Sequence, residues 1–306
     1  MTINELKKII ENYFKIHDAN QSLVIVAGPT GTGKSNFAIK LALKINGVII
    51  NADSIQVYKN MEIISSQPNK KDLKAVDHFL YGFKSIDENY SVGDWLCSLK
   101  GVLKNIKFQN KIPILVGGTG MYIDAVINGL SSIPRIDEKI KLKTNLMFER
   151  LGIKKFREIV NEIDPIYFKK NNDKQRLIRA YNVFVSTGKN LTYWHQSKSE
   201  TVINRKIFSI FLNKERKINY KNCDKRFENF IKSGALDEVR SIWEKKIDRS
   251  LSCTKALGVK WFLEFYDGKI SLKNAMECSM RDTRRYVKRQ NTWFNNNFVP
   301  NIKIKL

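Results

Sequence analysis

The feature that most constrains this chain is a glycine-rich segment, GPTGTGKS, at residues 28–35. It follows an apolar run typical of a buried strand, 23–27, and precedes a segment with helical apolar spacing, 35–44. A GxxxxGK[ST] pattern in this context predicts a phosphate-binding P-loop, whose backbone amides surround phosphate oxygens. The pattern does not decide between a nucleotide such as ATP and another di- or triphosphate. The predicted phosphate contacts are Gly28, Thr30, Gly31, Thr32, Gly33, Lys34, which neutralises charge, and Ser35, which ligates Mg²⁺.

Strands and helices alternate through the first part of the chain. Further short apolar runs at 47–50 and 112–116 predict buried strands, with a helical stretch near 92–107 between them. A helix is expected over residues 3–16, and a returning strand over 207–212. This alternation predicts an α/β fold with a doubly wound parallel sheet.

The pattern changes after Pro134 to helical segments rich in Lys and Arg, including 173–187 with Gly188 as a helix stop. We expect a P-loop core made of residues 1–136 and 201–306, with residues 137–200 inserted as a helical domain. Amphipathic helices are expected from Lys214 nearly to the end of the chain.

Positive charge is concentrated in the second part of the chain. The full sequence has 306 residues and a net charge of +24. Residues 1–134 hold 15 Lys and Arg against 11 Asp and Glu, whereas residues 135–306 hold 39 against 19. Every arginine lies at or after Arg135, and the planar guanidinium suits bidentate phosphate contacts. We therefore expect the second part to face a polyanion.

Several classes of protein are not expected. No stretch approaches the roughly 18 consecutive apolar residues of a membrane-spanning helix. The opening residues MTINELKKIIENYF mix acids with bases where a secretion signal has an apolar stretch. We therefore expect a cytoplasmic protein with no membrane partner. The four cysteines, at positions 97, 223, 253 and 278, stand far apart, so neither a structural zinc site nor a disulfide framework is expected.

Polar residues follow the second and third predicted strands. Asp53 lies in the segment NADSIQVY, residues 51–58, at the sheet edge where α/β proteins bind ligands. A carboxylate there acts as a general base, holds Mg²⁺ through water or caps a helix. The planar amide of Gln56 matches an adenine edge, although a plain surface position is the alternative. The segment GGTG, 117–120, brings backbone and the Thr119 hydroxyl close to the P-loop ligand, unless it is only a turn.

These segments together resemble the tRNA dimethylallyltransferases, also called tRNA isopentenyltransferases. The resemblance runs from about Leu23 to Phe298 in six ordered blocks, and the lack of C-terminal zinc-finger spacing favours the bacterial form. The blocks are the P-loop, NADSIQVY, His78 with Tyr90-Ser91-Val92, PILVGGTGMY at 113–122, QRLIRA at 175–180 with Thr187-Gly188, and TRRY with KRQNTWF at 283–294.

The resemblance implies a donor, an acceptor and roles for individual residues. The donor is dimethylallyl diphosphate, held with Mg²⁺ at the P-loop and by Arg226, and the acceptor is the adenosine N6 amine just 3′ of a tRNA anticodon. Asp53 matches the general base and Thr119 its partner near the reaction centre. The implied tRNA contacts are Asp53, Ser54, Ile55, Gln56, Thr119, Lys141, Gln175, Arg176, Leu177, Ile178 and Arg179.

A second set of tRNA contacts is predicted near the end of the chain. Cationic residues recur there at helical spacing and predict one basic helix face that contacts the anticodon stem-loop, with a solvated charged face as the alternative. These residues are Arg281, Arg284, Arg285, Lys288 and Arg289.

The sequence also departs from the family pattern, and other functions stay open. Residues 64–68 read ISSQP where the family has GTAKP, Asp77 replaces the first of two histidines, and Lys141 replaces an arginine. The alternatives are a P-loop small-molecule kinase or NTPase, an isopentenyltransferase acting on free adenine nucleotides, and a non-catalytic nucleic-acid-binding module. We expect the chain to act as a monomer.

Overall fold

The computed structural model describes residues 2–16, 21–105, 111–170, 173–197 and 203–306. They form two compact units, which we describe separately. Unit 1 comprises Met1–Ile127 and Ile203–Leu306, and unit 2 comprises Asn128–Val202. The domain boundaries expected at 136/137 and 200/201 stay predictions, and the second lies outside the described residues.

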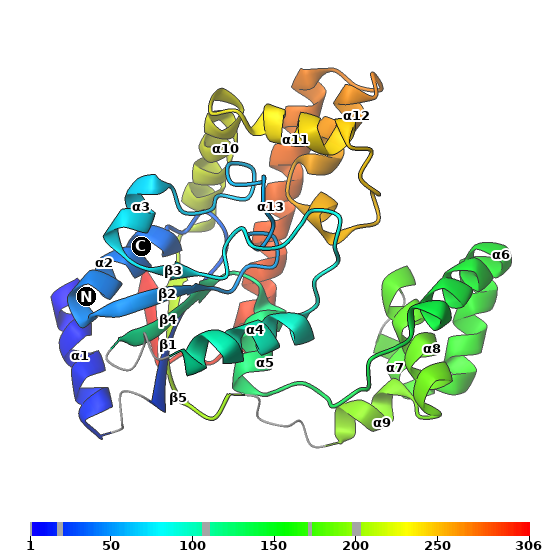
Figure 1. Cartoon of the computed structure of the whole chain (residues 1–306), viewed down its shortest axis with the longest axis horizontal. Helices are drawn as coiled ribbons and strands as arrows, with labels where there is room; N and C mark the ends of the chain where they lie inside the picture. The colour runs from blue at the N-terminus through cyan, green and yellow to red at the C-terminus, as the bar shows by residue number, and fades with distance from the viewer. Residues whose placement is uncertain (1, 17–20, 106–110, 171–172, 198–202) are drawn as a thin grey trace. The chain divides into compact units, whose positions relative to one another are not determined.

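A parallel sheet forms the centre of unit 1 (Figure 1). Its described strands have the order β3-β2-β4-β1-β5-β6, and every pairing is parallel. The predicted α/β fold with a doubly wound parallel sheet is thereby confirmed. Four strands occur where the sequence predicts them: β1 (Ser22–Ala27), β2 (Gly47–Asn51), β4 (Ile112–Gly117) and β5 (Lys206–Asn213).

Two edge strands were not predicted. They are β3 (His78–Phe79), which pairs with β2, and β6 (Ile302–Lys305), which pairs with β5. The helices predicted nearly to the end of the chain end at Asn297, and β6 follows them because IKIK alternates apolar and charged residues with the period of a strand. Ile304 is accordingly buried while Lys303 and Lys305 are exposed.

Helices α1 (Ile3–Ile16) and α2 (Lys34–Ile45) cover one face of the sheet. The apolar stripe of α1 places Leu6 and Ile10 in the core, and the Tyr13 hydroxyl donates to the Ile207 carbonyl at 3.1 Å. Helix α1, for which the sequence predicts no function, is therefore part of the core of unit 1.

The opposite face is covered by α4 (Val92–Lys104), α5 (Gly120–Ile127) and α13 (Leu272–Asn297), as Figure 1 shows. The Trp95 ring stacks on Tyr122 at 4.3 Å between centroids, and its indole N–H donates to the Asn51 carbonyl at 3.0 Å. Phe211 of β5 contacts Phe294 of α13 at 5.2 Å between centroids. The Trp95 contacts hold α4 against α5 and β2, and the contact between the two phenylalanines holds α13 against β5.

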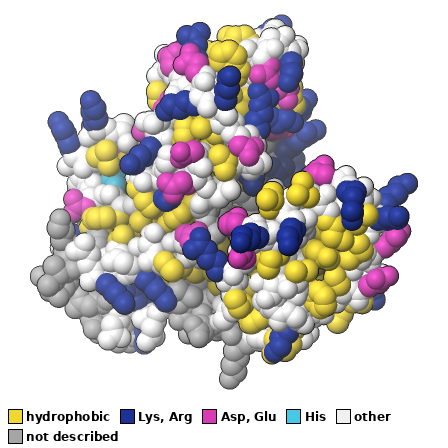
Figure 2. Space-filling view, turned by 45° about the vertical axis from the view of Figure 1, so that its right-hand side comes forward, with side chains coloured by type: hydrophobic (Ala, Val, Ile, Leu, Met, Phe, Trp, Pro, Cys, Tyr) yellow, Lys and Arg dark blue, Asp and Glu magenta, His cyan; other side chains and the backbone are white. Residues whose placement is uncertain are grey.

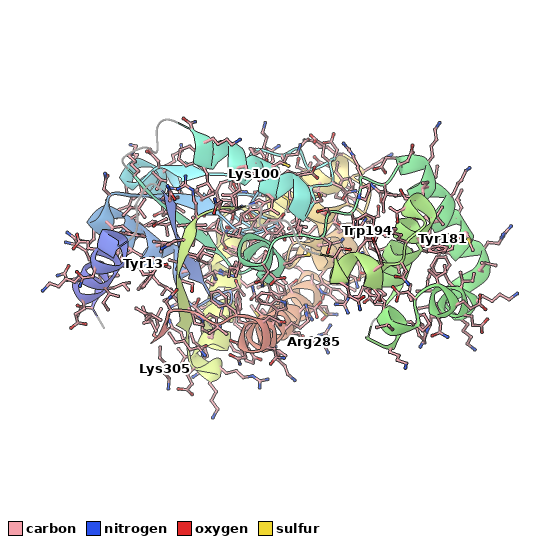
Figure 3. The ribbon with its side chains drawn as sticks, turned by 90° about the horizontal axis from the view of Figure 1, so that it is seen from below. Tyr13, Lys100, Tyr181, Trp194, Arg285 and Lys305 are labelled. Atoms are coloured by element: carbon pink, nitrogen blue, oxygen red, sulfur yellow. The ribbon has the colours of Figure 1, made fainter. Side chains whose placement is uncertain are left out.

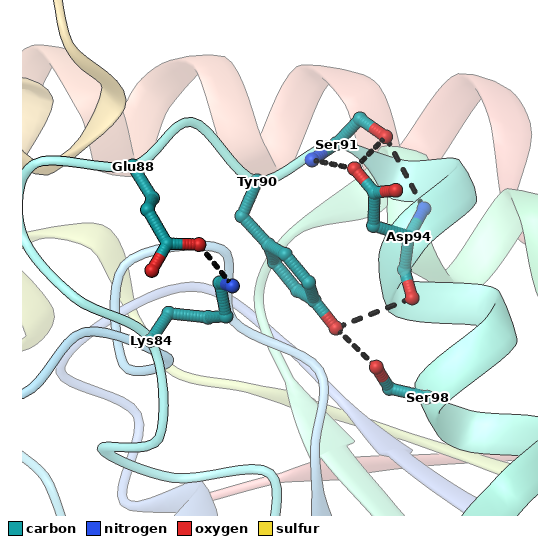
Figure 4. Close-up of polar contacts among 6 residues, drawn as sticks. All are labelled: Lys84, Glu88, Tyr90, Ser91, Asp94 and Ser98. Carbon is teal, nitrogen blue, oxygen red and sulfur yellow. Dashed lines mark hydrogen bonds and ion pairs between the residues drawn. The ribbon is translucent and has the colours of Figure 1, made fainter. Parts of the chain in front are cut away.

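Local polar contacts fix the segment that leads into α4 (Figure 4). Ser91 and Asp94 form a capping box, in which each side chain accepts from the backbone N–H of the other. The Tyr90 hydroxyl donates to Ser98 Oγ at 2.7 Å, and Lys84 pairs with Glu88. The block Tyr90-Ser91-Val92 thus has a structural explanation as a helix start.

The C-terminal helices of unit 1 build a second core that includes Met61, Phe227, Val239 and Phe262. Helix α13 extends from this core to the sheet. No described helix has the length and apolarity needed to cross a bilayer. The remaining helices of unit 1 are α3 (Lys70–Ala75), α10 (Arg216–Lys232), α11 (Ala235–Glu244), the 3-10 helix Ser252–Lys255 and α12 (Val259–Tyr266).

Unit 2 is helical in its described residues. Phe156, Val160, Leu177 and Val183 are fully buried in its core, and Figure 3 shows Tyr181 and Trp194 among its helices. Its elements are α6 (Glu138–Ile163, with a kink at Gly152), α7 (Pro165–Lys170), α8 (Lys174–Thr187, with Asp173 as N-cap and Gly188 as C-cap) and α9 (Leu191–Gln196).

Candidate functional site

The glycine-rich loop connects β1 to α2 in a conformation that its glycines allow. Gly31 and Gly33 have φ values of 81° and 90°, which L-residues with a Cβ rarely adopt. A Cβ on Gly31 would lie 2.5 Å from the sulfur of Cys223 on α10. The loop is therefore shaped both by its backbone and by the close packing of α10.

Lys34 begins α2 and turns its ammonium back over the loop, where Nζ donates to the Pro29 carbonyl at 2.7 Å. Burial, opposed by the charge of Asp53 and assisted by that of Arg226, lowers the pKa of Lys34 to about 8. A bound anion would favour the charged form of this lysine.

Arg226 of α10 reaches the same loop. Its guanidinium donates to the Thr30 hydroxyl at 2.6 Å, and the neighbouring Asn219 Nδ2 donates to the Thr30 carbonyl at 3.1 Å. Burial lowers the pKa of Arg226, whereas Cys223 and Asp53 oppose that effect. None of the described carboxylates forms an ion pair with Lys34 or Arg226. Two cations thus meet at the loop, and neither forms an ion pair with a described carboxylate.

Asp53 follows β2 and is held by its own neighbours. Its backbone N–H donates to Asn51 Oδ1 at 2.7 Å, and its Oδ1 accepts from the Ile55 N–H at 2.9 Å. Because Asp53 influences the pKa values of both Lys34 and Arg226, the carboxylate belongs to the same electrostatic environment as the loop.

Thr119 joins this group from the end of β4. Its hydroxyl accepts from the Ser54 N–H at 3.1 Å, so the turn after β4 is bonded to the segment that carries Asp53. Gly117 permits this approach, because a Cβ there would lie only 2.1 Å from the Ala52 carbonyl oxygen. The structure therefore brings together the loop, Asp53, Thr119 and Arg226 within unit 1.

Sequence reasoning missed two residues of α13 that enter this site. Gln290 accepts from the Thr30 N–H at 2.9 Å and donates to the Gly118 carbonyl at 2.8 Å. Burial raises the pKa of Tyr286, and so does the charge of Asp53. Both residues lie in the family-like blocks and are four apart, on one side of the helix. A spacing of four residues indicates that Tyr286 and Gln290 share one helix face. Only the cationic residues of this helix were interpreted from the sequence.

Gln56 supports a neighbouring loop. Its Nε2 donates to the carbonyls of Ser65 and Ser66 at 2.9 and 2.6 Å, which leaves only Oε1 for the predicted contact. Glu238 of α11 holds the same loop by accepting from the N–H groups of Ile63 and Ile64, both at 2.8 Å. Gln56 and Glu238 thus hold the segment 64–68, which departs from the family pattern, by hydrogen bonds. The neighbouring Ile55 packs against the second core.

The cationic residues of α13 do not all share one role. Arg284 is partly buried and forms an ion pair with Asp224 of α10, in which Nη1 donates to the two carboxylate oxygens at 2.9 and 2.8 Å. Arg281, Arg285 and Lys288 are exposed, and Figure 3 shows Arg285 at the surface of α13. The predicted basic face therefore loses the charge of Arg284, because this arginine pairs with Asp224 and joins α13 to α10.

A pocket of about 540 Å³ lies beside α12 and α13. The Trp261 indole N–H donates to Asp282 at 2.8 Å on its wall. Figure 2 shows Lys and Arg side chains gathered on the upper part of unit 1, where α10, α11 and α12 lie. Lys255 and Lys260 were not predicted as contacts. The residues that line the pocket include Arg249, Lys255, Lys260, Trp261, Arg285 and Arg289.

The predicted tRNA contacts of unit 2 differ in their exposure. Gln175, Arg176 and Arg179 on α8 are exposed, and Ile178 is partly buried. The side chain of Leu177 is fully buried in the core of unit 2, because the helical period that exposes its neighbours turns it inward. Its predicted tRNA contact stays a prediction. Lys141 on α6 is paired with Glu138 at 2.6 Å, and Arg176 with Asp173 at 3.2 Å.

The chain matches the family model described as IPP transferase over residues 56–297. The tRNA dimethylallyltransferase of Pelagibacter ubique is 37% identical over 289 residues, which are 94% of this chain and 92% of that protein. The tRNA dimethylallyltransferase of Rickettsia felis is 39% identical over 277 residues, 90% of each protein. These matches confirm the resemblance predicted from the sequence.

Solved structures agree with the sequence relatives. The full-length tRNA isopentenylpyrophosphate transferase of Bacillus halodurans has a TM-score of 0.66 and 29% identity, covering 93% of this chain and 90% of that one. A eukaryotic dimethylallyltransferase described as acting on tRNA has a TM-score of 0.75 and 26% identity, covering 90% of this chain and 70% of that one.

Proposed function

The chain belongs to the IPP transferase family, and from this membership we propose that it is a tRNA dimethylallyltransferase. It transfers a dimethylallyl group from dimethylallyl diphosphate to the N6 amine of the adenosine 3′-adjacent to the anticodon, and it releases diphosphate. The relatives at 37% and 39% identity, both named tRNA dimethylallyltransferases, support this activity.

The observation that carries the proposal is the pair of cations at the glycine-rich loop. Lys34 and Arg226 both reach this loop and have no ion pair with a described carboxylate. Backbone amides at the start of α2 add further positive potential. A diphosphate supplies the missing negative charge, and its negative charge grows as the allylic C–O bond breaks.

Asp53 and Thr119 lie where the acceptor reacts. An exocyclic adenine amine is a weak nucleophile because its lone pair is delocalised into the ring. As the N6–carbon bond forms, the C–O bond breaks and its electron pair leaves with the diphosphate, while Asp53 accepts the N6 proton. Thr119 holds the Asp53 segment through the Ser54 N–H.

Ser35 suits a Mg²⁺ ion that accompanies the diphosphate. Its side chain is exposed in the first turn of α2 and has no hydrogen bond to any residue that the structure describes. Oxygen ligands of this kind, together with phosphate oxygens and water, are the usual partners of Mg²⁺. When bound, the ion stabilises the negative charge on the leaving diphosphate.

The acceptor adenosine must leave its stack to reach Asp53, which costs a few kcal/mol. Contacts with the anticodon stem-loop offset this energy in the proposal. Arg281, Arg285 and Lys288 on α13 contact its phosphates, as do Lys141, Gln175, Arg176 and Arg179 in unit 2. A monomer is proposed to be sufficient for the reaction, since one chain can supply the loop, Arg226, Asp53 and Thr119 together.

Radiolabelled dimethylallyl diphosphate tests the proposal against the alternatives. The protein is incubated with the labelled donor and, separately, with tRNA, AMP or ATP. We expect label in tRNA alone. Label in AMP but not in tRNA would identify a transferase for free nucleotides, and ATP hydrolysis without transfer would identify an NTPase or kinase. Absence of both transfer and hydrolysis would favour the binding module.

A further inference from the structure

Gln290 connects two loops that follow different strands. One side-chain atom accepts from the Thr30 N–H of the glycine-rich loop, and the other donates to the Gly118 carbonyl in the turn after β4. The side chain is only 6% exposed. One amide on α13 therefore bonds to both sides of the candidate site.

The two bonds require an amide of this length. Thr30 offers a donor and Gly118 an acceptor, and only a side chain that accepts with one atom and donates with the other satisfies both. The approach is close, because a Cβ on Gly118 would lie 2.6 Å from Gln290 Nε2 and 3.1 Å from the Gly28 carbonyl oxygen. Removing the amide leaves two buried backbone groups without partners, which is unfavourable.

Each loop continues to a reacting group. Thr30, a predicted diphosphate contact, is also bound by Arg226 and Asn219. A shift of Thr30 would therefore move part of the predicted diphosphate site. Gly118 precedes Thr119, whose hydroxyl bonds to the Ser54 N–H beside Asp53. The contacts therefore run continuously from the donor loop through Gln290 to the segment that carries the base.

We infer that Gln290 is a positioning residue, which sets the separation between the bound donor and the carboxylate that activates the acceptor. This inference rests on the proposed function. Reacting atoms must approach to about 3–3.5 Å, and a misplacement of about 1 Å lowers the rate by on the order of 100-fold. The Gln290 side chain, which bonds to the glycine-rich loop and to the turn after β4, restrains the two against such a shift.

The first variant is Gln290→Leu, which keeps much of the side-chain volume and removes both polar atoms. We expect kcat to fall by about 10-fold to 100-fold, the Kd for inorganic diphosphate to rise by about tenfold, and the Kd for tRNA to stay unchanged. The matched control is Asn295→Ala, an exposed amide on the same helix, which should leave all three quantities unchanged. A thermal melt establishes that each variant is folded.

Gln290→Glu separates positioning from a general structural role. A protonated carboxyl group can accept from Thr30 with its carbonyl oxygen and donate to Gly118 with its O–H, as the amide does. An ionised carboxylate instead faces the Gly118 carbonyl and the donor diphosphate. Burial raises the pKa of a carboxyl group, and the nearby cations Lys34 and Arg226 lower it. The variant should therefore regain activity as the pH falls toward the pKa that these opposing effects set.

The quantity to measure is the ratio of kcat/KM for Gln290→Glu to that of the wild type, from roughly pH 8 to pH 6. The ratio removes the pH effects that are common to both proteins. We expect it to rise as the pH falls. A ratio that stays constant with pH, or a folded Gln290→Leu variant with wild-type kcat, would overturn the inference.

Binding of inorganic diphosphate distinguishes this inference from the proposed function. Were the wild type unable to modify tRNA, the proposed function would fail, yet the diphosphate Kd of Gln290→Leu would still decide the role of Gln290. A Kd raised by about tenfold supports it, and an unchanged Kd contradicts it.

Discussion

The guanidinium of Arg226 donates to the hydroxyl of Thr30 at 2.6 Å, although 196 positions separate them in the chain. Helix α10, from the second half of the chain, thereby completes the loop that follows strand β1. A glycine-rich loop motif describes only the N-terminal half of this site.

Arg226→Gln should weaken donor binding without affecting tRNA. The variant keeps a hydrogen-bond donor near Thr30 but removes the charge, so we expect the KM for dimethylallyl diphosphate to rise by on the order of tenfold or more. Lys225→Gln, an exposed neighbour on α10, is the control. An unchanged donor KM would remove Arg226 from the diphosphate site.

Lys34 should give diphosphate binding a pH dependence. Its pKa is lowered to about 8, so the charged form that an anion selects is present below that pH and is lost as the pH rises through it. We therefore expect the affinity for diphosphate to decline above about pH 8. Lys34→Arg, whose guanidinium stays charged, should lack this decline.

Calorimetry of both proteins over the same pH range checks this prediction. Their comparison cancels the ionisation of diphosphate itself. Parallel curves for the wild type and Lys34→Arg would show that Lys34 does not titrate in the binding step.

Two adjacent arginines on α13 should behave differently. Arg284→Met breaks the ion pair with Asp224, so it should lower the free energy of unfolding by about 1 kcal/mol, since the pair is partly exposed. Arg285→Met removes an exposed cation and should leave stability unchanged, while the slope of log K for tRNA against log salt falls by about 1. Urea denaturation and tRNA titrations at several salt concentrations measure both effects. A loss of stability in Arg285→Met, with a reduced salt dependence only in Arg284→Met, would contradict the structure.

Local sequence pattern was sufficient for the central strands and for the glycine-rich loop. The apolar run before Gly28 and the GGTG after the third strand both lie at the same sheet edge, because parallel strands end there together. Asp53 and Thr119 could therefore be placed together from the sequence.

Contacts over long sequence separations could not be derived in this way. Gln290 bonds to Thr30 across 260 positions and to Gly118 across 172, and no local pattern encodes such pairs. The same limit applies to Arg284, since a cation on a predicted helix does not reveal that Asp224 on another helix neutralises it. Leu177 shows a different limit, because the whole motif is predicted to contact tRNA, whereas its helical period buries the side chain of this one member.

Asp53 carries the central claim, and mass spectrometry of tRNA nucleosides tests it most directly. Asp53→Asn keeps a side-chain oxygen for the Ile55 N–H but cannot accept the N6 proton, so turnover should fall by at least about 100-fold with tRNA affinity little changed. After incubation with dimethylallyl diphosphate and digestion, wild-type protein should yield N6-dimethylallyladenosine from the position 3′ of the anticodon, and the variant only traces. Equal yields from both proteins, or no modified adenosine from the wild type, would contradict the account.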